Sequence, residues 1–93
     1  MKRQIIKTNG EVIGYTPKLG AHYDLEELQG IVGGPIEIIC LGKNKIMVIT
    51  EEGKLENMCI NEKATDIAHE ASAIFDDDYI VGDVLICRRD DIL

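Results

Sequence analysis

Residues 36–50 read IEIICLGKNKIMVIT. Two nearly continuous apolar runs of strand length, residues 36–41 and 45–50, flank the tripeptide Gly-Lys-Asn, which predicts a β-hairpin. Few polar residues interrupt either run, so we expect both strands to be buried on both faces and to lie at the centre of a sheet. Glu37 is the only charged residue in the first run.

The sequence before this hairpin predicts a second hairpin and a short helix. Residues 3–16, RQIIKTNGEVIGYT, read as two short strands around an Asn-Gly turn. Residues 24–34, DLEELQGIVGG, read as a helix in which Asp24 caps the N-terminus and Glu27 completes a capping-box-like pair. The two final glycines allow the left-handed conformation that commonly ends a helix.

The sequence after the hairpin predicts a third strand, a longer helix and a final strand. The residues EEG at 51–53 turn the chain into a strand KLENMCI at 54–60. Residues 61–75, NEKATDIAHEASAIF, have a helical period, with Asn61 as the N-cap and three aspartates after the helix. Residues 79–89, YIVGDVLICRR, read as a strand interrupted at its Gly-Asp pair.

This order of elements predicts an α+β fold for a single domain over residues 1–93. Short connections favour a small, mostly antiparallel sheet of five or six strands, with the two helices packed on one face. Such a sheet leaves edges that invite pairing with another chain, and the small aliphatic core would gain from further burial. We therefore expect a homodimer, in contact through the long apolar final strand.

The composition is globular, with 45% hydrophobic and 29% charged residues. No signal-peptide pattern opens the sequence, and no apolar run approaches the roughly 20 residues that cross a bilayer, so we expect no membrane association. Cys40, Cys59 and Cys87 are odd in number and widely spaced, which disfavours a disulfide framework and favours the reducing cytoplasm.

The charge of this acidic protein is unevenly distributed. The net charge is −7, and residues 47–93 hold twelve acidic and four basic side chains, a net −8. An acidic half repels phosphate and offers no basic stripe, which disfavours direct nucleic-acid binding. Solubility explains the charge, and so does an acidic surface directed at a basic partner.

Three polar features are candidate binding sites, and each has a simple structural explanation. Glu37 is either a carboxylate held on a rigid strand or a side chain that reaches water at the rim of the sheet. The segment Glu51-Glu52-Gly53-Lys54 is either a site or a hairpin turn in which Gly53 takes a positive φ. Asn61 is explained by helix capping. The candidate binding residues are Glu37, Glu51, Glu52, Gly53, Lys54 and Asn61.

The sequence carries no catalytic signature. It lacks a phosphate-binding glycine loop, a Ser/His/Asp set and an activated cysteine. The histidines and cysteines show no C-x-x-C or H-x-x-x-H spacing, and the three aspartates at 76–78 lack the rest of a calcium loop. We predict no catalytic residue, no metal site and no cofactor.

Four segments in order resemble the family called domain of unknown function 3846. They are LEELQGIVGGPIEIICL, then IMVITEEGKL, then an asparagine six residues beyond Leu55, then IVGDVLIC, and together they cover about residues 24–87. The sequence departs from the family pattern at Thr50, where Asn is common, and at MCIN, which replaces a proline-containing segment. The resemblance marks Gly33, Gly34, Glu37, Glu51, Glu52, Gly53, Lys54, Asn61 and Gly82.

The resemblance implies a small protein of phages, mobile elements or bacteria with no established activity. Because turn geometry explains Gly53 better than it explains the two glutamates, the 51–54 turn gains weight as a site. We expect a non-enzymatic binding module that holds a small ligand or peptide at this polar strand-end rim. The alternative is an acidic inhibitor or decoy of a phage or mobile element that acts on a basic host protein.

Overall fold

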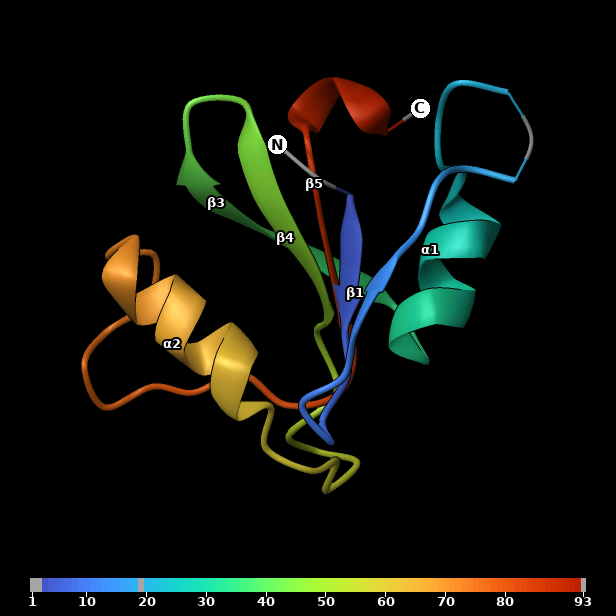
Figure 1. The fold of residues 1–93 in the computed structure, drawn as a ribbon. Coiled ribbons are helices and arrows are strands. Elements are labelled where there is room, and N and C mark those ends of the chain that lie inside the picture. The colour runs from blue at the N-terminus through green and yellow to red at the C-terminus, as the bar shows by residue number, and fades with distance from the viewer. Residues whose placement is uncertain (1–2, 19, 93) are drawn as a thin grey trace.

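The computed structural model describes residues 3–18 and 20–92 and confirms a small α+β fold. Within these residues one antiparallel sheet has five strands in the order β2-β1-β5-β4-β3 (Figure 1). The elements are β1 (Gln4–Ile6), β2 (Val12–Gly14), α1 (Leu25–Val32), β3 (Ile36–Gly42), β4 (Lys45–Thr50), α2 (Glu62–Glu70), β5 (Val84–Cys87) and the 3-10 turn η1 (Arg89–Asp91).

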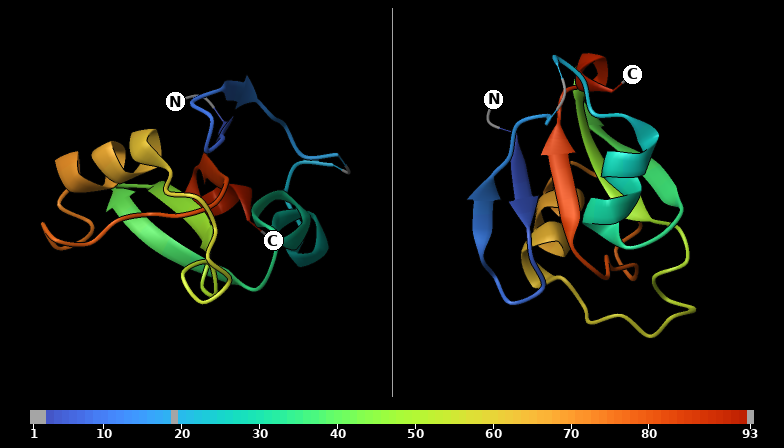
Figure 2. Two further views of the ribbon diagram at one scale, coloured as in Figure 1. Left: turned by 90° about the horizontal axis from the view of Figure 1, so that it is seen from below. Right: turned by 90° about the vertical axis from the view of Figure 1, so that its right-hand side faces the viewer.

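The two helices lie on opposite faces of the sheet, so the prediction that they share one face is wrong. Met47 belongs to the core cluster under α2, whereas Ile46 and Val48 belong to the cluster under α1. Figure 2, right, shows α1 in front of the sheet and α2 behind it. The physical reason is that β4 and β5 are apolar on both faces, so each face needs its own cover.

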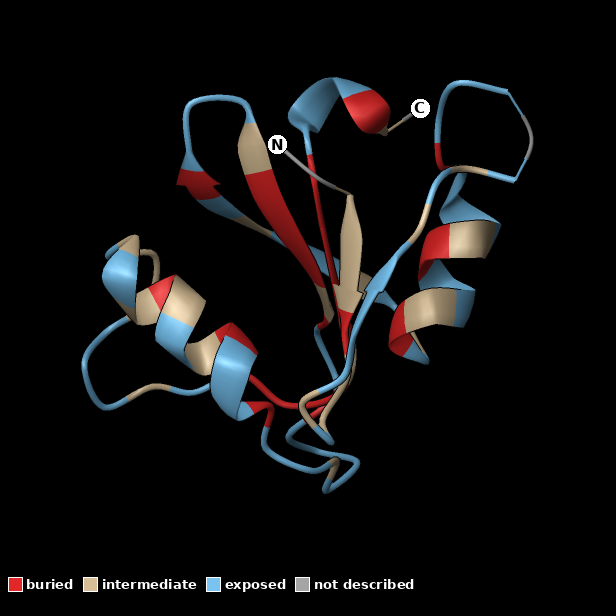
Figure 3. Ribbon diagram, in the orientation of Figure 1, coloured by how far each residue is buried: buried red, intermediate tan, exposed pale blue. Residues whose placement is uncertain are grey.

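The order of the strands corrects two further expectations. Both strands of the 36–50 hairpin were predicted to be central; β4 is, whereas β3 lies at the edge of the sheet and is mostly exposed (Figure 3). The final strand, β5, is buried at every position and pairs with β1 on one side and β4 on the other. The final strand therefore has no free edge for a dimer contact, and the homodimer itself stays a prediction.

The predicted hairpins and helix caps are present. β1 pairs with β2, and β3 pairs with β4, each antiparallel. Asp24 accepts a hydrogen bond of 2.8 Å from the backbone N–H of Glu27, and the helix ends at Gly33, whose φ is 87°. The Glu27 carboxylate bonds outside the helix, to the hydroxyl of Tyr15 and the N–H of Lys18. The capping box is thus only half formed.

The predicted third strand, residues 54–60, does not form. Residues 51–57 turn on themselves, because the N–H groups of Glu56 and Met58 donate to the carbonyls of Glu52 and Gly53. Ile60 alone makes a β-bridge, with Val81.

Helix α2 also ends five residues earlier than predicted, at Glu70. Just beyond it, Ser72 has a φ of 54°.

Asn61 joins three segments that are far apart in the chain. Its side-chain Nδ2 donates at 2.9 Å to the carbonyls of Ile6 and Gly82, and its Oδ1 accepts from the N–H of Ala64 at 3.1 Å. Its own backbone N–H donates to the carbonyl of Ile80 at 2.8 Å. Asn61 is 0% exposed, so the three hydrogen bonds of its side chain are made away from water.

We expect Asn61→Ala to lower the free energy of unfolding by about 3 kcal/mol, because it removes a helix cap and two further buried hydrogen bonds, to the carbonyls of Ile6 and Gly82. The exposed cap of α1 provides the matched control. Asp24→Ala removes a capping bond alone and should cost about 1 kcal/mol. Urea denaturation measures both, and equal costs would contradict the joining role of Asn61.

Candidate functional site

A pocket of about 590 Å³ opens on the α2 face of the sheet. The ends of β3 and β4 form one wall, and the chain that follows α2 forms the other. The 51–54 turn closes the end where β4 finishes. Its lining residues are Glu37, Ile39, Ile49, Thr50, Glu51, Lys54, Ser72, Ala73, Ile74, Phe75, Asp78, Tyr79, Ile80 and Val81.

Hydrogen bonds from α2 hold the second wall in place. Thr65 Oγ1 donates to the carbonyl of Asn61 at 2.8 Å and accepts from the N–H of Ile80 at 2.9 Å. One turn later, Nε2 of His69 donates to the carbonyl of Asp78 at 2.9 Å. His69 is therefore a positioning residue on the edge of the helix, and residues 78–80 are fixed against α2.

Lys54 reaches from the 51–54 turn to the wall formed by the chain after α2. Its ammonium group forms an ion pair with Asp78 and lies 4.3 Å from the ring centroid of Tyr79. The hydrogen bond to Asp78 raises the pKa of Lys54, and the same bond lowers the pKa of Asp78. Both side chains stay charged at neutral pH, and each largely neutralises the other.

The remaining charge of the pocket is negative. Glu37 and Glu51 have no ion-pair partner within 4.0 Å in the part of the chain that the structure describes. Both side chains are exposed, and both line the pocket. With Lys54 and Asp78 paired, these two carboxylates give the pocket a net negative charge that favours cations.

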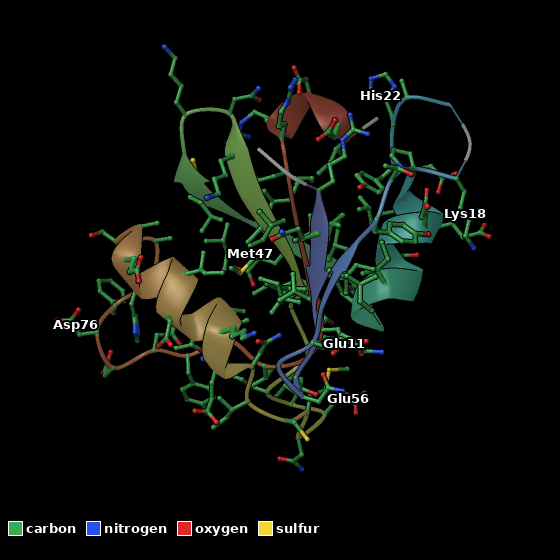
Figure 4. All side chains as sticks on the ribbon, viewed as in Figure 1. Glu11, Lys18, His22, Met47, Glu56 and Asp76 are labelled. Atoms are coloured by element: carbon green, nitrogen blue, oxygen red, sulfur yellow. The ribbon has the colours of Figure 1, made fainter. Side chains whose placement is uncertain are left out.

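The apolar part of the pocket includes an unusually exposed aromatic side chain. Phe75, the only phenylalanine in the chain, is 83% exposed, and Tyr79 is 41% exposed. Ile39, Ile49 and Ile74 form the partly buried floor. Figure 4 shows Asp76 at the outer side of the loop after α2, which is the loop that carries Phe75. Aromatic faces beside carboxylates suit a cation with an apolar stem.

The structure brings together three of the six predicted site residues. Glu37, Glu51 and Lys54 line the pocket, whereas Glu52, Gly53 and Asn61 do not. Asn61 is buried and its amide is fully engaged, so it is a structural residue.

Gly53 is required by close packing, because a Cβ there would lie 2.5 Å from Cγ2 of Val81. The prediction that Gly53 takes a positive φ is wrong, since the positive-φ glycines of the described chain are Gly10, Gly20, Gly33 and Gly82.

Phe75, Asp78 and Tyr79 are pocket residues that the sequence analysis missed. The sequence feature that marks them is the single phenylalanine directly before three aspartates. This segment was interpreted as the end of a helix and a solvated turn. An exposed aromatic beside an acidic run could have identified this wall of the pocket.

A second concavity, of about 540 Å³, lies beside α1. Some of its polar groups already serve the fold, because Glu27 accepts hydrogen bonds from Tyr15 and Lys18. The buried Tyr23 nearby donates its hydroxyl hydrogen to the carbonyl of Tyr15. Burial raises the pKa of Tyr23 to about 12, which keeps this phenol protonated. Two of the three acidic side chains of this concavity, Asp24 and Glu27, are therefore already engaged by groups of the fold.

The cysteines and acidic side chains form no metal cluster in the region that the structure covers. Cys40 and Cys59 are exposed free thiols. Cys87 is buried, and burial raises the pKa of its thiol to about 12, so it packs as a small hydrophobe. No helix among the described residues is long and apolar enough to cross a membrane.

The family model described as domain of unknown function (DUF3846) matches residues 3–92 of the chain, nearly its whole length. Neither the curated proteins nor the solved structures show a significant match.

We expect Gly53→Ala to destabilise the protein by about 1–3 kcal/mol, because the added methyl group overlaps Val81 and presses on Thr50. The cost should shrink in a Val81→Ala background, where the overlapping methyl is gone. Gly30→Ala in α1 is the control, since nothing lies within 4 Å of its Cβ position and alanine favours a helix. Thermal unfolding measures all four variants; an undiminished cost in the Val81→Ala background would contradict this packing.

Proposed function

We propose that this chain, which belongs to the family described as domain of unknown function (DUF3846), is a non-enzymatic binding module. Its pocket on the α2 face would hold the cationic end of a small ligand or of a peptide side chain. The observation that carries the proposal is the pair of exposed carboxylates, Glu37 and Glu51, beside the exposed ring of Phe75.

The pocket matches a cation that has an apolar stem. The stem would lie on Ile39 and Ile49, the charged head would face Glu37 and Glu51, and the aromatic rings would cover it. An anion would meet two unpaired carboxylates, while the one lysine of the pocket is already engaged by Asp78. Desolvation would also be smaller for a guanidinium than for a compact ammonium, which favours an arginine-like group.

Binding fits the pocket better than catalysis does. The carboxylates stand on the open rim, and no serine, cysteine or histidine side chain among the lining residues pairs with them as a nucleophile or base would. The free thiols support a reducing compartment, and we place the protein in the cytoplasm. The family likeness supports an origin in phages, mobile elements or bacteria.

The alternative function is an acidic inhibitor or decoy that binds a basic host protein. The observation in its favour is the set of exposed carboxylates outside the pocket, which includes Glu52, Asp76 and Asp77. Such binding would spread over the surface and weaken steeply with salt. A pull-down from host lysate at low ionic strength that recovers a basic protein with both wild type and Glu37→Gln would favour this alternative.

We expect n-butylguanidinium, a mimic of the arginine side chain, to bind with millimolar affinity in low-salt calorimetry. Neutral n-butylurea, which has nearly the same shape, should bind more weakly. Glu37→Gln and Glu51→Gln should each reduce the affinity by up to about fivefold, because exposed charge pairs contribute up to about 1 kcal/mol.

Glu62→Gln is the matched control, since Glu62 is exposed at the start of α2 and outside the pocket. Equal affinity of wild type for the guanidinium and the urea, or an equal loss in Glu62→Gln, would refute binding in the pocket.

A further inference from the structure

Strand β3 presents a free backbone edge. It ends the sheet, with β4 as its only neighbour among the described strands. The N–H of Glu51 donates to the carbonyl of Pro35, and the register then makes Glu37–Ile49 and Ile39–Met47 the next hydrogen-bonded pairs. The N–H and C=O groups of Ile36, Ile38 and Cys40 must therefore point away from the sheet.

This edge also carries partly exposed apolar side chains. Ile38 is 44% exposed and Cys40 is exposed, both on the face of the sheet that packs against α1. Within β3 the only charged side chain is Glu37, and proline is absent from the strand. The irregularity in β3 falls between Cys40 and Gly42, so residues 36–40 form a regular apolar edge, and such edges pair readily with another strand.

The pocket reaches the same edge. Glu37 and Ile39 belong to β3 and line the pocket on the α2 face. A strand added beside β3 would therefore place alternate side chains directly at the mouth of the pocket. Its other side chains would lie on the opposite face, against Ile38 and Cys40.

We propose that β3 accepts an extended basic peptide as a sixth, antiparallel strand, with a Lys or Arg side chain in the pocket beside Glu37 and apolar side chains over Ile38. This inference rests on the proposed function and names its ligand class. Main-chain hydrogen bonds would supply affinity, and the alternating side chains would supply specificity.

The register of β3 determines which peptide residues would face the pocket and which would hydrogen-bond to β3. Residues opposite Glu37 and Ile39 would form non-hydrogen-bonded pairs, with Cα atoms about 4.5 Å apart and side chains on the α2 face. Residues opposite Ile36, Ile38 and Cys40 would exchange hydrogen bonds with β3 and point to the other face. The peptide should thus alternate basic and apolar residues.

Charge favours a peptide over a second copy of this chain. A second copy carries a net charge of −7, and the only charge on its own β3 is another glutamate. In a symmetric antiparallel pair about Ile38, Glu37 would face Ile39 of the other copy, so neither pocket would receive a cation. A basic peptide complements both the pocket and the net charge.

The test uses a short capped peptide that alternates Val and Arg, with calorimetry on the wild-type protein. N-methylation of the Val residues removes the N–H groups that would face β3 and should reduce affinity roughly tenfold or more. N-methylation of the Arg residues alters N–H groups that face solvent and should leave affinity nearly unchanged. Equal affinities of the two methylated peptides would overturn strand addition.

Two further results separate this inference from the proposed function. If the unmethylated peptide binds, loses affinity with Glu37→Gln and ignores both methylation patterns, the pocket binds cations and the strand-addition inference fails alone. If neither this peptide nor n-butylguanidinium binds, both the strand-addition inference and the proposed cation-binding function are wrong. A mass of two chains in light scattering that Ile38→Lys reduces to one would assign the edge to a second copy and overturn the peptide proposal.

Discussion

The side-chain amide of Asn61 holds together the parts of the molecule that build the pocket. Its two N–H groups donate to the carbonyl of Ile6, the last residue of β1, and to that of Gly82, just before β5, and its oxygen caps the start of α2. Thr65 and His69, one and two turns into that helix, then fix residues 78–80. The position of Asp78 and Tyr79, and through them of Lys54, depends on this chain of hydrogen bonds. Asn61, which the sequence analysis predicted as a binding residue, therefore supports the pocket without lining it.

The distribution of apolar residues explains why the pocket lies at the edge of the sheet. β4 and β5 are apolar on both faces and occupy positions between other strands, so each helix covers a different side of them. Helix α2 contributes small buried residues, Ala64 and Ala68, and none of its residues lines the pocket. The chain after α2 returns past the ends of β3 and β4, and the pocket lies between this chain and the sheet. Polar groups at the ends of β3 and β4 consequently meet an aromatic wall at a free strand edge.

Local signals in the sequence predicted local structure well. The two hairpins, the Asp24 and Asn61 caps and the glycine exit of α1 depend on neighbouring residues, and all are present. Strand order and the faces of the helices depend on contacts between distant segments, which a single sequence does not specify. The apolar pattern of residues 36–41 therefore suggested a central strand where an edge strand exists. Residues 54–60 do not form a strand, because the N–H groups of Glu56, Asn57 and Met58 bond to carbonyls of the preceding turn.

The distinction between local signals and contacts between distant segments also explains which residues of the site were predicted. Glu37, Glu51 and Lys54 were found because they stand at strand ends, whereas Phe75 and Tyr79 required knowledge of how the chain returns over the sheet. Gly53 and Asn61 carried the same family signal as the pocket residues but serve packing and hydrogen bonding. The family pattern therefore indicated the region of the fold that holds the pocket, but it did not distinguish pocket residues from structural ones.

The central claim is that the α2 face of the sheet, at the β3 edge, holds a cation with an apolar stem. Isoleucine methyl NMR during titration with n-butylguanidinium tests it most directly, because isoleucines line both faces of the sheet. We expect saturable shifts at Ile39, Ile49, Ile74 and Ile80, which line the pocket, and none at Ile5, Ile31 and Ile36, which pack on the α1 side. Shifts of equal size on both faces, or no saturable shift at all, would contradict the claim.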